Sequence, residues 1–103
     1  MNTNKSKIDL NTLRQNIDLI DLELLELIKK RFEVVLDVWK FKLENNVSPL
    51  QQSRWDEVLD DKLKKSKDMG LDEIMIREIW NSIHNWALRL EKSIINKGSN
   101  NLY

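Results

Sequence analysis

Lysine and arginine together number 17 in this 103-residue chain, and so do aspartate and glutamate. This balance excludes a strongly basic surface of the kind that attracts nucleic acid or an anionic membrane. The absence of cysteine excludes disulfides, thiolate nucleophiles and cysteine-based metal sites.

The rest of the composition predicts the fold class. Charged residues make up 33% and hydrophobic residues 41%, beside two glycines and one proline. Such a chain is expected to be a soluble, all-α protein of one domain. No run of about 18 uninterrupted apolar residues occurs, so no membrane span is expected. The polar first residues do not resemble a secretory signal, and a cytoplasmic location is the default expectation.

One long helix is predicted from Leu10 to about Asn45, a stretch with neither glycine nor proline. Arg31 and Lys42 lie on nearly the same side of it, because eleven residues make about three turns. A cation on an apolar seam is costly unless it meets an anion, so an anion is expected to bind there. The seam residues recur at three- and four-residue steps, with Arg31 at one of the steps: Leu10, Leu13, Ile17, Ile20, Leu24, Leu27, Val34, Val38 and Phe41.

The length of this helix points to a partner. About 36 helical residues span roughly 54 Å, whereas a compact domain of this size has a radius of gyration of about 13 Å. The remaining residues of the chain cannot cover so long a seam. We therefore expect the same helix of a second copy to cover part of it, in a homodimer.

Two shorter helices are expected after the connection around Pro49, over about 52–69 and 73–96. Ser53 and Asp72 are the expected N-caps, and Gly70 is expected to end the first of the two as a C′ glycine. The predicted apolar sides are Trp55, Val58, Leu59 and Leu63 on the first, and Ile76, Ile79, Trp80, Ile83, Ala87, Leu90 and Ile94 on the second.

These elements define the predicted domain organisation. A disordered tail over residues 1–8 precedes a helical domain over 9–96, in which Asp9 caps the first helix. A flexible polar tail over 97–103 follows. The domain is therefore expected to contain three helices, one long and two shorter.

Four cations are candidates for the anion site: Arg31, Lys42, Arg14 and Arg54. Each also has an ordinary interpretation as a surface or helix-end residue, such as an ion pair between Arg14 and Asp18 one turn away. Arg54 opens a helix, where a cation is unfavourable to the helix dipole. If these cations converge without acidic partners, they form a site for a small dianion, since guanidinium binds carboxylate in a bidentate fork.

Several segments together resemble the all-helical chorismate mutases (the AroQ class), over Leu10 to about Ile94. The segment LRQNIDLIDLELLELIKKR matches the family signature LRxxIDxIDxxLLxLLxxR. Lys40 and Lys42 follow as K-x-K, then SRWDEVL, then GLDEIMIREIWNSIH. The resemblance implies an enzyme that rearranges chorismate to prephenate without a cofactor, as an intertwined homodimer with two sites.

The resemblance also implies roles for individual residues. Arg31 and Arg14 are similar to arginines that bind the substrate carboxylates, with Arg14 supplied by the other protomer. Helix geometry agrees, because 17 residues separate them by about 25 Å on one helix. Lys42 is similar to the lysine that donates a hydrogen bond to the ether oxygen of the substrate, and Arg54 to an arginine that enters from the connection.

Four positions differ from many family members. Gln51 replaces an aspartate, and Trp55 replaces a glutamate that holds the C4 hydroxyl of the substrate. Ala87 replaces a serine, and Glu91 replaces a glutamine that donates to the ether oxygen. Glu91 can donate only when protonated; burial would raise its pKa and nearby cations such as Lys42 would lower it, which leaves its charge open.

These differences keep other functions open. The same scaffold serves 4-amino-4-deoxychorismate mutases, which resemble this chain at Gln51, Trp55 and Glu91, and isochorismate-pyruvate lyases. A non-catalytic helical dimer that regulates a partner enzyme is the alternative from another class. A lone His84 does not predict a metal site, and no metal or cofactor is expected. Three tryptophans, Trp39, Trp80 and Trp86, are interpreted as core or interface aromatics.

Overall fold

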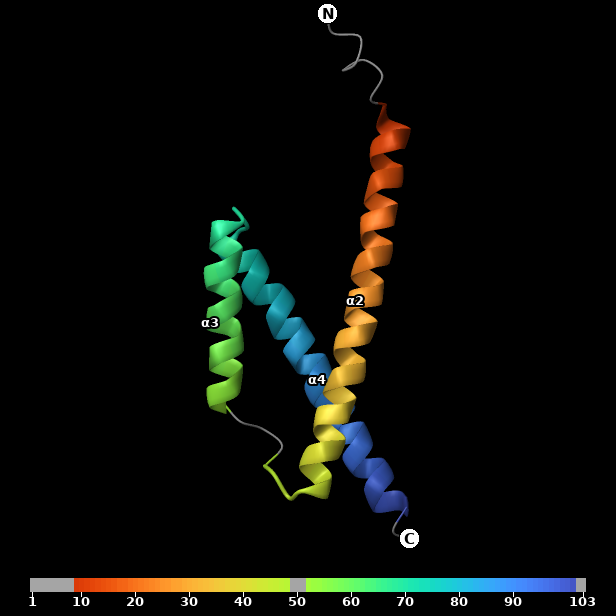
Figure 1. The fold of residues 1–103 in the computed structure, drawn as a ribbon, viewed down its shortest axis with the longest axis vertical. Coiled ribbons are helices and arrows are strands. Elements are labelled where there is room, and N and C mark those ends of the chain that lie inside the picture. Colours follow the sequence, from red (N-terminus) through yellow and green to blue (C-terminus); the bar gives the residue numbers. More distant parts are fainter. Residues whose placement is uncertain (1–8, 49–51, 102–103) are drawn as a thin grey trace, which may run out of the picture. The chain divides into compact units, whose positions relative to one another are not determined.

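Helices account for nearly all of the backbone that the computed structural model describes, which is residues 9–48 and 52–101. They are α2 (Leu10–Glu44), α3 (Gln52–Asp68) and α4 (Glu73–Asn101), as Figure 1 shows. No strand occurs in these two ranges. The prediction of an all-α fold with one long and two shorter helices is therefore confirmed. None of these helices is long and apolar enough to cross a membrane.

Both ends of α2 are set by side chains with a preference for helix ends. The Asp9 carboxylate accepts a hydrogen bond of 2.7 Å from the backbone N–H of Thr12, which confirms it as the N-cap. At the other end Asn46 adopts a left-handed conformation with φ 54°. The N–H of Val47 then donates to the carbonyl of Lys42 at 2.9 Å. This reversal stops the helix just beyond Lys42.

The turn between α3 and α4 follows the predicted chemistry. Gly70 has φ 76°, a conformation that costs side-chain-bearing residues energy. Its N–H donates to the carbonyl of Lys67 and the N–H of Leu71 to that of Ser66, each at 3.0 Å, which completes a Schellman motif. The Asp72 carboxylate then accepts a hydrogen bond of 3.0 Å from Met75 N–H and caps α4.

The predicted N-cap of α3 and the predicted end of α4 were wrong. Helix α3 begins at Gln52, so Ser53 lies inside its first turn and is not the N-cap. Helix α4 continues past residue 96 to Asn101, so residues 97–101 are helical where a flexible tail was expected. The expectations for residues 1–8, for Pro49 to Gln51 and for 102–103 fall outside the described residues.

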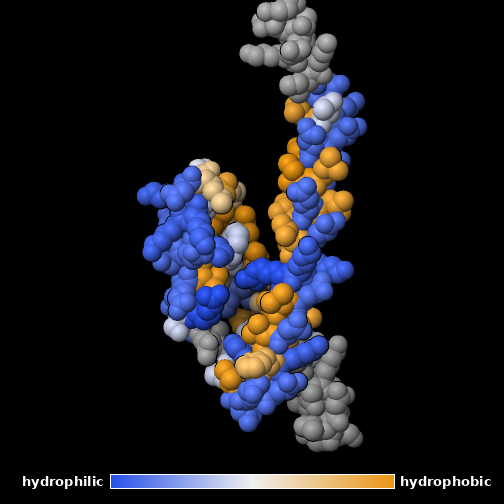
Figure 2. Space-filling model, viewed as in Figure 1, coloured by the Kyte–Doolittle hydropathy of each residue, from blue (hydrophilic) through white to orange (hydrophobic). Residues whose placement is uncertain are grey.

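The chain divides into two structural units, residues 1–34 and 35–103. In the first unit the helix exposes its apolar side chains along its length, as Figure 2 shows. No described residue of α2 is buried, and the seam residues Ile17, Ile20 and Leu27 are 56%, 56% and 60% exposed. The predicted seam is therefore present in sequence but uncovered in a single chain.

In the second unit α3 packs against α4. Ile76 and Ala87 are buried there, and the predicted apolar residues of α3 are half-buried. Trp80 is also half-buried, whereas Trp86 is 55% exposed with the Arg89 guanidinium 4.5 Å from its ring. The interpretation of Trp86 as a core residue is therefore wrong for a single chain, and its role at an interface stays a prediction.

Candidate functional site

One face of α4 carries the centre of the candidate site in the second unit. Ala87 and Glu91 lie one turn apart on this face, with Ala87 8% exposed and Glu91 half-buried. The indole Nε1 of Trp39 donates a hydrogen bond of 3.0 Å to the carbonyl of Ala87. This bond fixes the last part of α2 against α4, since it joins a side chain of one helix to the backbone of the other.

Lys42 stands in the last turn of α2, where the helix end described above sets its position. Its Nζ lies 4.6 Å from the centre of the Trp39 ring, in a cation–π arrangement. Because the same Trp39 donates its hydrogen bond to Ala87, its ring contacts Lys42 of α2 while its Nε1 contacts the backbone of α4. Lys42 is half-buried, and its charge acts on the Glu91 carboxyl.

The sequence left the charge of Glu91 open, and the structure gives the direction in which its pKa is shifted. Burial raises the pKa of the Glu91 carboxyl above its ordinary value, while the charges of Lys42 and Lys92 act to lower it. The effect of burial is the larger, and the pKa is raised overall. A protonated carboxyl can donate a hydrogen bond, whereas a carboxylate can only accept one. Glu91 therefore keeps a donor form to higher pH than an exposed glutamate.

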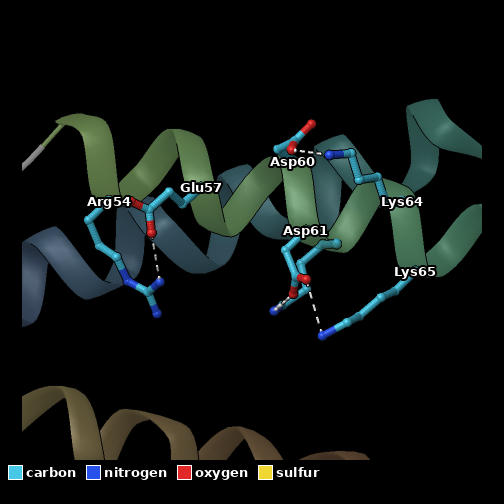
Figure 3. Close-up of polar contacts among 7 residues, drawn as sticks. Arg54, Glu57, Asp60, Asp61, Lys64 and Lys65 are labelled. Carbon is cyan, nitrogen blue, oxygen red and sulfur yellow. Dashed lines mark hydrogen bonds and ion pairs between the residues drawn. The ribbon is translucent and has the colours of Figure 1, made fainter.

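Arg54 and Trp55 lie in the first turn of α3. The guanidinium Nη1 of Arg54 lies 3.5 Å from Oε2 of Glu57, and both side chains are about 70% exposed. Figure 3 shows this ion pair together with the pairs that Asp60 and Asp61 form further along the helix. An exposed pair of this kind contributes about 0–1 kcal/mol. Arg54 thus has an exposed acidic partner on its own helix, which an anionic ligand can displace at little cost in free energy.

The ring of Trp55 stacks on the imidazole of His84, with ring centroids 4.0 Å apart and an angle of 14° between the planes. Both residues are half-buried. From the sequence, His84 was considered only as a metal ligand, and this contact was not predicted. One signal could have found it, because His84 lies three residues before Ala87 and therefore on the same face of α4.

The other two candidate arginines, Arg14 and Arg31, belong to the first unit. Arg14 is exposed and Arg31 is half-buried, both on α2. The rise of 1.5 Å per residue separates their backbones by about 25 Å, so one helix cannot bring both to one small molecule. Gln51 lies outside the described residues. Within those that are described, no three His, Asp or Glu side chains gather in a way that could hold a metal ion.

Comparison with known proteins identifies the group to which these features belong. The family model described as chorismate mutase type II matches residues 13–92. A 4-amino-4-deoxychorismate mutase of Streptomyces pristinaespiralis is 27% identical over 89 residues, which are 86% of this chain and 69% of the relative. A 4-amino-4-deoxychorismate mutase of Streptomyces venezuelae is 25% identical over 91 residues, 88% of each chain. No solved structure gives a significant match.

Proposed function

Because the chain belongs to the chorismate mutase type II family, we propose that it rearranges chorismate to prephenate. The observation that carries this proposal is the match of the family model over residues 13–92. The reaction is intramolecular: the C–O bond of the enolpyruvyl ether breaks while a new C–C bond forms in the same molecule. No proton, electron or second reactant enters or leaves.

Such a reaction asks two things of its site. The substrate must be held in its compact, reactive conformer, and the negative charge that develops on the ether oxygen must be stabilised. Lys42 and Glu91 suit the second task, because the ammonium is a permanent donor and the raised pKa of Glu91 favours its protonated, donating form. Trp39 contacts Lys42 through its ring and the carbonyl of Ala87, one turn from Glu91, through its Nε1.

Arg14, Arg31 and Arg54 suit the first task. Each guanidinium can bind a carboxylate through two parallel hydrogen bonds, and the substrate carries two carboxylates. Arg14 and Arg31 are about 25 Å apart on their helix, so both can reach one substrate only if they come from different chains. We therefore assign Arg14 to the site of the partner chain, with Gln51, Trp55 and Ala87 around the ring of the substrate.

A homodimer follows from the same reasoning. The helical part of the first unit exposes a continuous series of leucine and isoleucine side chains and buries none. Apolar patches of this extent on a monomer mark an interaction surface. A second copy presents an equal helix and would supply Arg14 at the same time, which makes it the simplest occupant.

A second candidate reaction has a specific observation in its favour. Both relatives described above carry the name 4-amino-4-deoxychorismate mutase. Trp55 stands here in place of a carboxylate, and an aromatic face can attract an ammonium group by a cation–π interaction. The amino analogue of chorismate is therefore the alternative substrate, and the rearrangement of its bonds is the same.

The test is incubation of the protein with chorismate, 4-amino-4-deoxychorismate and isochorismate in separate reactions. Products are identified by mass and absorbance. Prephenate from chorismate supports the first assignment, and the amino analogue of prephenate with little prephenate supports the second. Salicylate and pyruvate from isochorismate, without rearrangement of the other two, would assign the protein to lyase chemistry. No turnover of any substrate by the folded protein would overturn the enzymatic proposal.

A further inference from the structure

The first turn of α3 carries Arg54 and leaves it exposed. Arg54 is the third residue of α3, which begins at Gln52. The ion pair of Arg54 with Glu57 joins two side chains of the same helix. A contact within one helix cannot fix that helix relative to another element.

The neighbouring residue supplies a contact that can. Trp55 stacks on His84 of α4, with the rings nearly parallel and their centroids 4.0 Å apart. Stacked aromatic rings attract one another through close contact of their faces and bury apolar surface from water. Since Trp55 directly follows Arg54, this contact holds the backbone of Arg54 in place relative to α4.

The face of α4 that makes this contact is also the face that holds the centre of the candidate site. His84, Ala87 and Glu91 follow one another at three- and four-residue steps. The backbones of His84 and Glu91 are about 10 Å apart by the helical rise. The stack therefore places the start of α3 at one end of a short row whose other end is Glu91 beside the charge of Lys42.

We propose that His84 is a positioning residue for Arg54, acting through the ring of Trp55. The inference rests on the proposed function, in which Arg54 binds a substrate carboxylate. The imidazole does not touch the substrate. It offers a flat surface that fixes the indole, and the indole fixes the first turn of α3, so that the guanidinium of Arg54 samples a smaller volume before substrate arrives.

The kinetic test is a double-mutant cycle of His84→Ala and Arg54→Ala, with His84→Phe as the variant that keeps a stacking ring. We expect His84→Ala to raise KM by about three- to tenfold, the range that aromatic pairs contribute, with kcat changed less than about twofold because uniform binding is lost. His84→Phe should restore KM. In the Arg54→Ala background, His84→Ala should change KM less than about twofold, because the residue that it positions is gone. Asn85→Ala, an exposed neighbour on α4, is the matched control and should leave KM unchanged.

A second readout does not depend on turnover. The amides of Asp56, Glu57 and Val58 donate to the carbonyls of residues 52–54 and close the first turn of α3. Their hydrogen exchange should become faster in His84→Ala and return to the wild-type rate in His84→Phe.

These measurements separate the inference from the proposed function. If the wild type turns over substrate and His84→Ala leaves KM unchanged, or raises it equally in both Arg54 backgrounds, the positioning role is wrong while the function stands. Unchanged amide exchange in His84→Ala also overturns the inference. No turnover of any of the three substrates by the wild type overturns the proposed function, and with it the role of Arg54.

Discussion

Replacement of Leu27 by alanine tests whether the apolar helix of the first unit is an interface. Leu27 is 60% exposed in a single chain, and it occupies the seam that the sequence pattern defines. If the chain works as a monomer, the substitution removes methyl groups from the surface and should change stability by no more than about 0.5 kcal/mol. If a second copy covers the seam, the substitution leaves a cavity in the interface.

The size of the effect follows from the exposed fraction. Leucine-to-alanine changes at fully covered sites cost about 2–5 kcal/mol. Since 60% of the Leu27 surface is available to a partner, about 1.2–3 kcal/mol is expected per copy. A twofold dimer contains the position twice, which gives about 2.4–6 kcal/mol. At about 1.4 kcal/mol per factor of ten, the dissociation constant of the dimer should rise at least about 50-fold.

Sedimentation equilibrium over a range of chain concentrations measures this constant directly. The matched control is Glu23→Ala, one turn earlier at an exposed position of the same helix, which should leave the constant within about threefold. The reasoning would be refuted by a folded wild-type monomer at micromolar concentration. It would equally be refuted if Leu27→Ala and Glu23→Ala dissociated alike.

The remaining predictions concern the site and one turn. Arg14→Ala and Arg31→Ala should each be nearly inactive. Activity should reappear after the two variants are unfolded and refolded together, because one site of each mixed dimer is then intact. An inactive mixture in which mixed dimers have been verified would exclude the shared site. Since burial raises the pKa of Glu91, kcat/KM should fall as pH rises through that raised value, and Glu91→Gln should flatten the profile; a pH-independent wild type would contradict the donor role. The same proton gives stability that is complete below the ordinary glutamate pKa and lost as pH rises through the folded one, so the pH dependence of the free energy of unfolding should weaken in Glu91→Gln. Gly70→Ala should cost about 1–2 kcal/mol through the left-handed backbone conformation alone, because no atom lies within 4 Å of the added Cβ. The melting temperature should fall by about 4–8 °C for each kcal/mol, and an unchanged melting temperature would contradict this.

The sequence predicted the helix ends best where a single residue determines the geometry. Asp9 and Asp72 cap helices because a short carboxylate can reach a free backbone N–H, and Gly70 ends one because only glycine adopts φ 76° without cost. Ser53 was expected to cap α3, but the helix begins one residue earlier, at Gln52. Gly98 lowers helix propensity by about 1 kcal/mol, which does not stop a helix whose earlier turns are already formed.

Contacts between helices were harder to predict than the helices. Arg31 and Lys42 could be singled out because a cation on an apolar seam violates a local pattern. The Trp55–His84 stack violates none, since each ring is unremarkable in its own helix and the contact exists only through the packing of α3 on α4. The charge state of Glu91 was undecidable for the same reason, because burial depends on neighbours that are distant in sequence.

The proposed sharing of one site between two chains has a thermodynamic consequence. Arg14 and Arg31 belong to the first unit and Lys42, Arg54 and Glu91 to the second. In the proposed dimer, a dianionic substrate held by Arg14 of one chain and by the cations of the other would bind the dimer and not the separate chains. Whatever binds only the assembled state stabilises it by mass action, and linkage is reciprocal. Substrate must therefore tighten the dimer by the same factor by which dimerisation tightens substrate binding. In the proposed dimer, substrate would therefore supply part of the free energy of assembly beside the exposed leucines of α2.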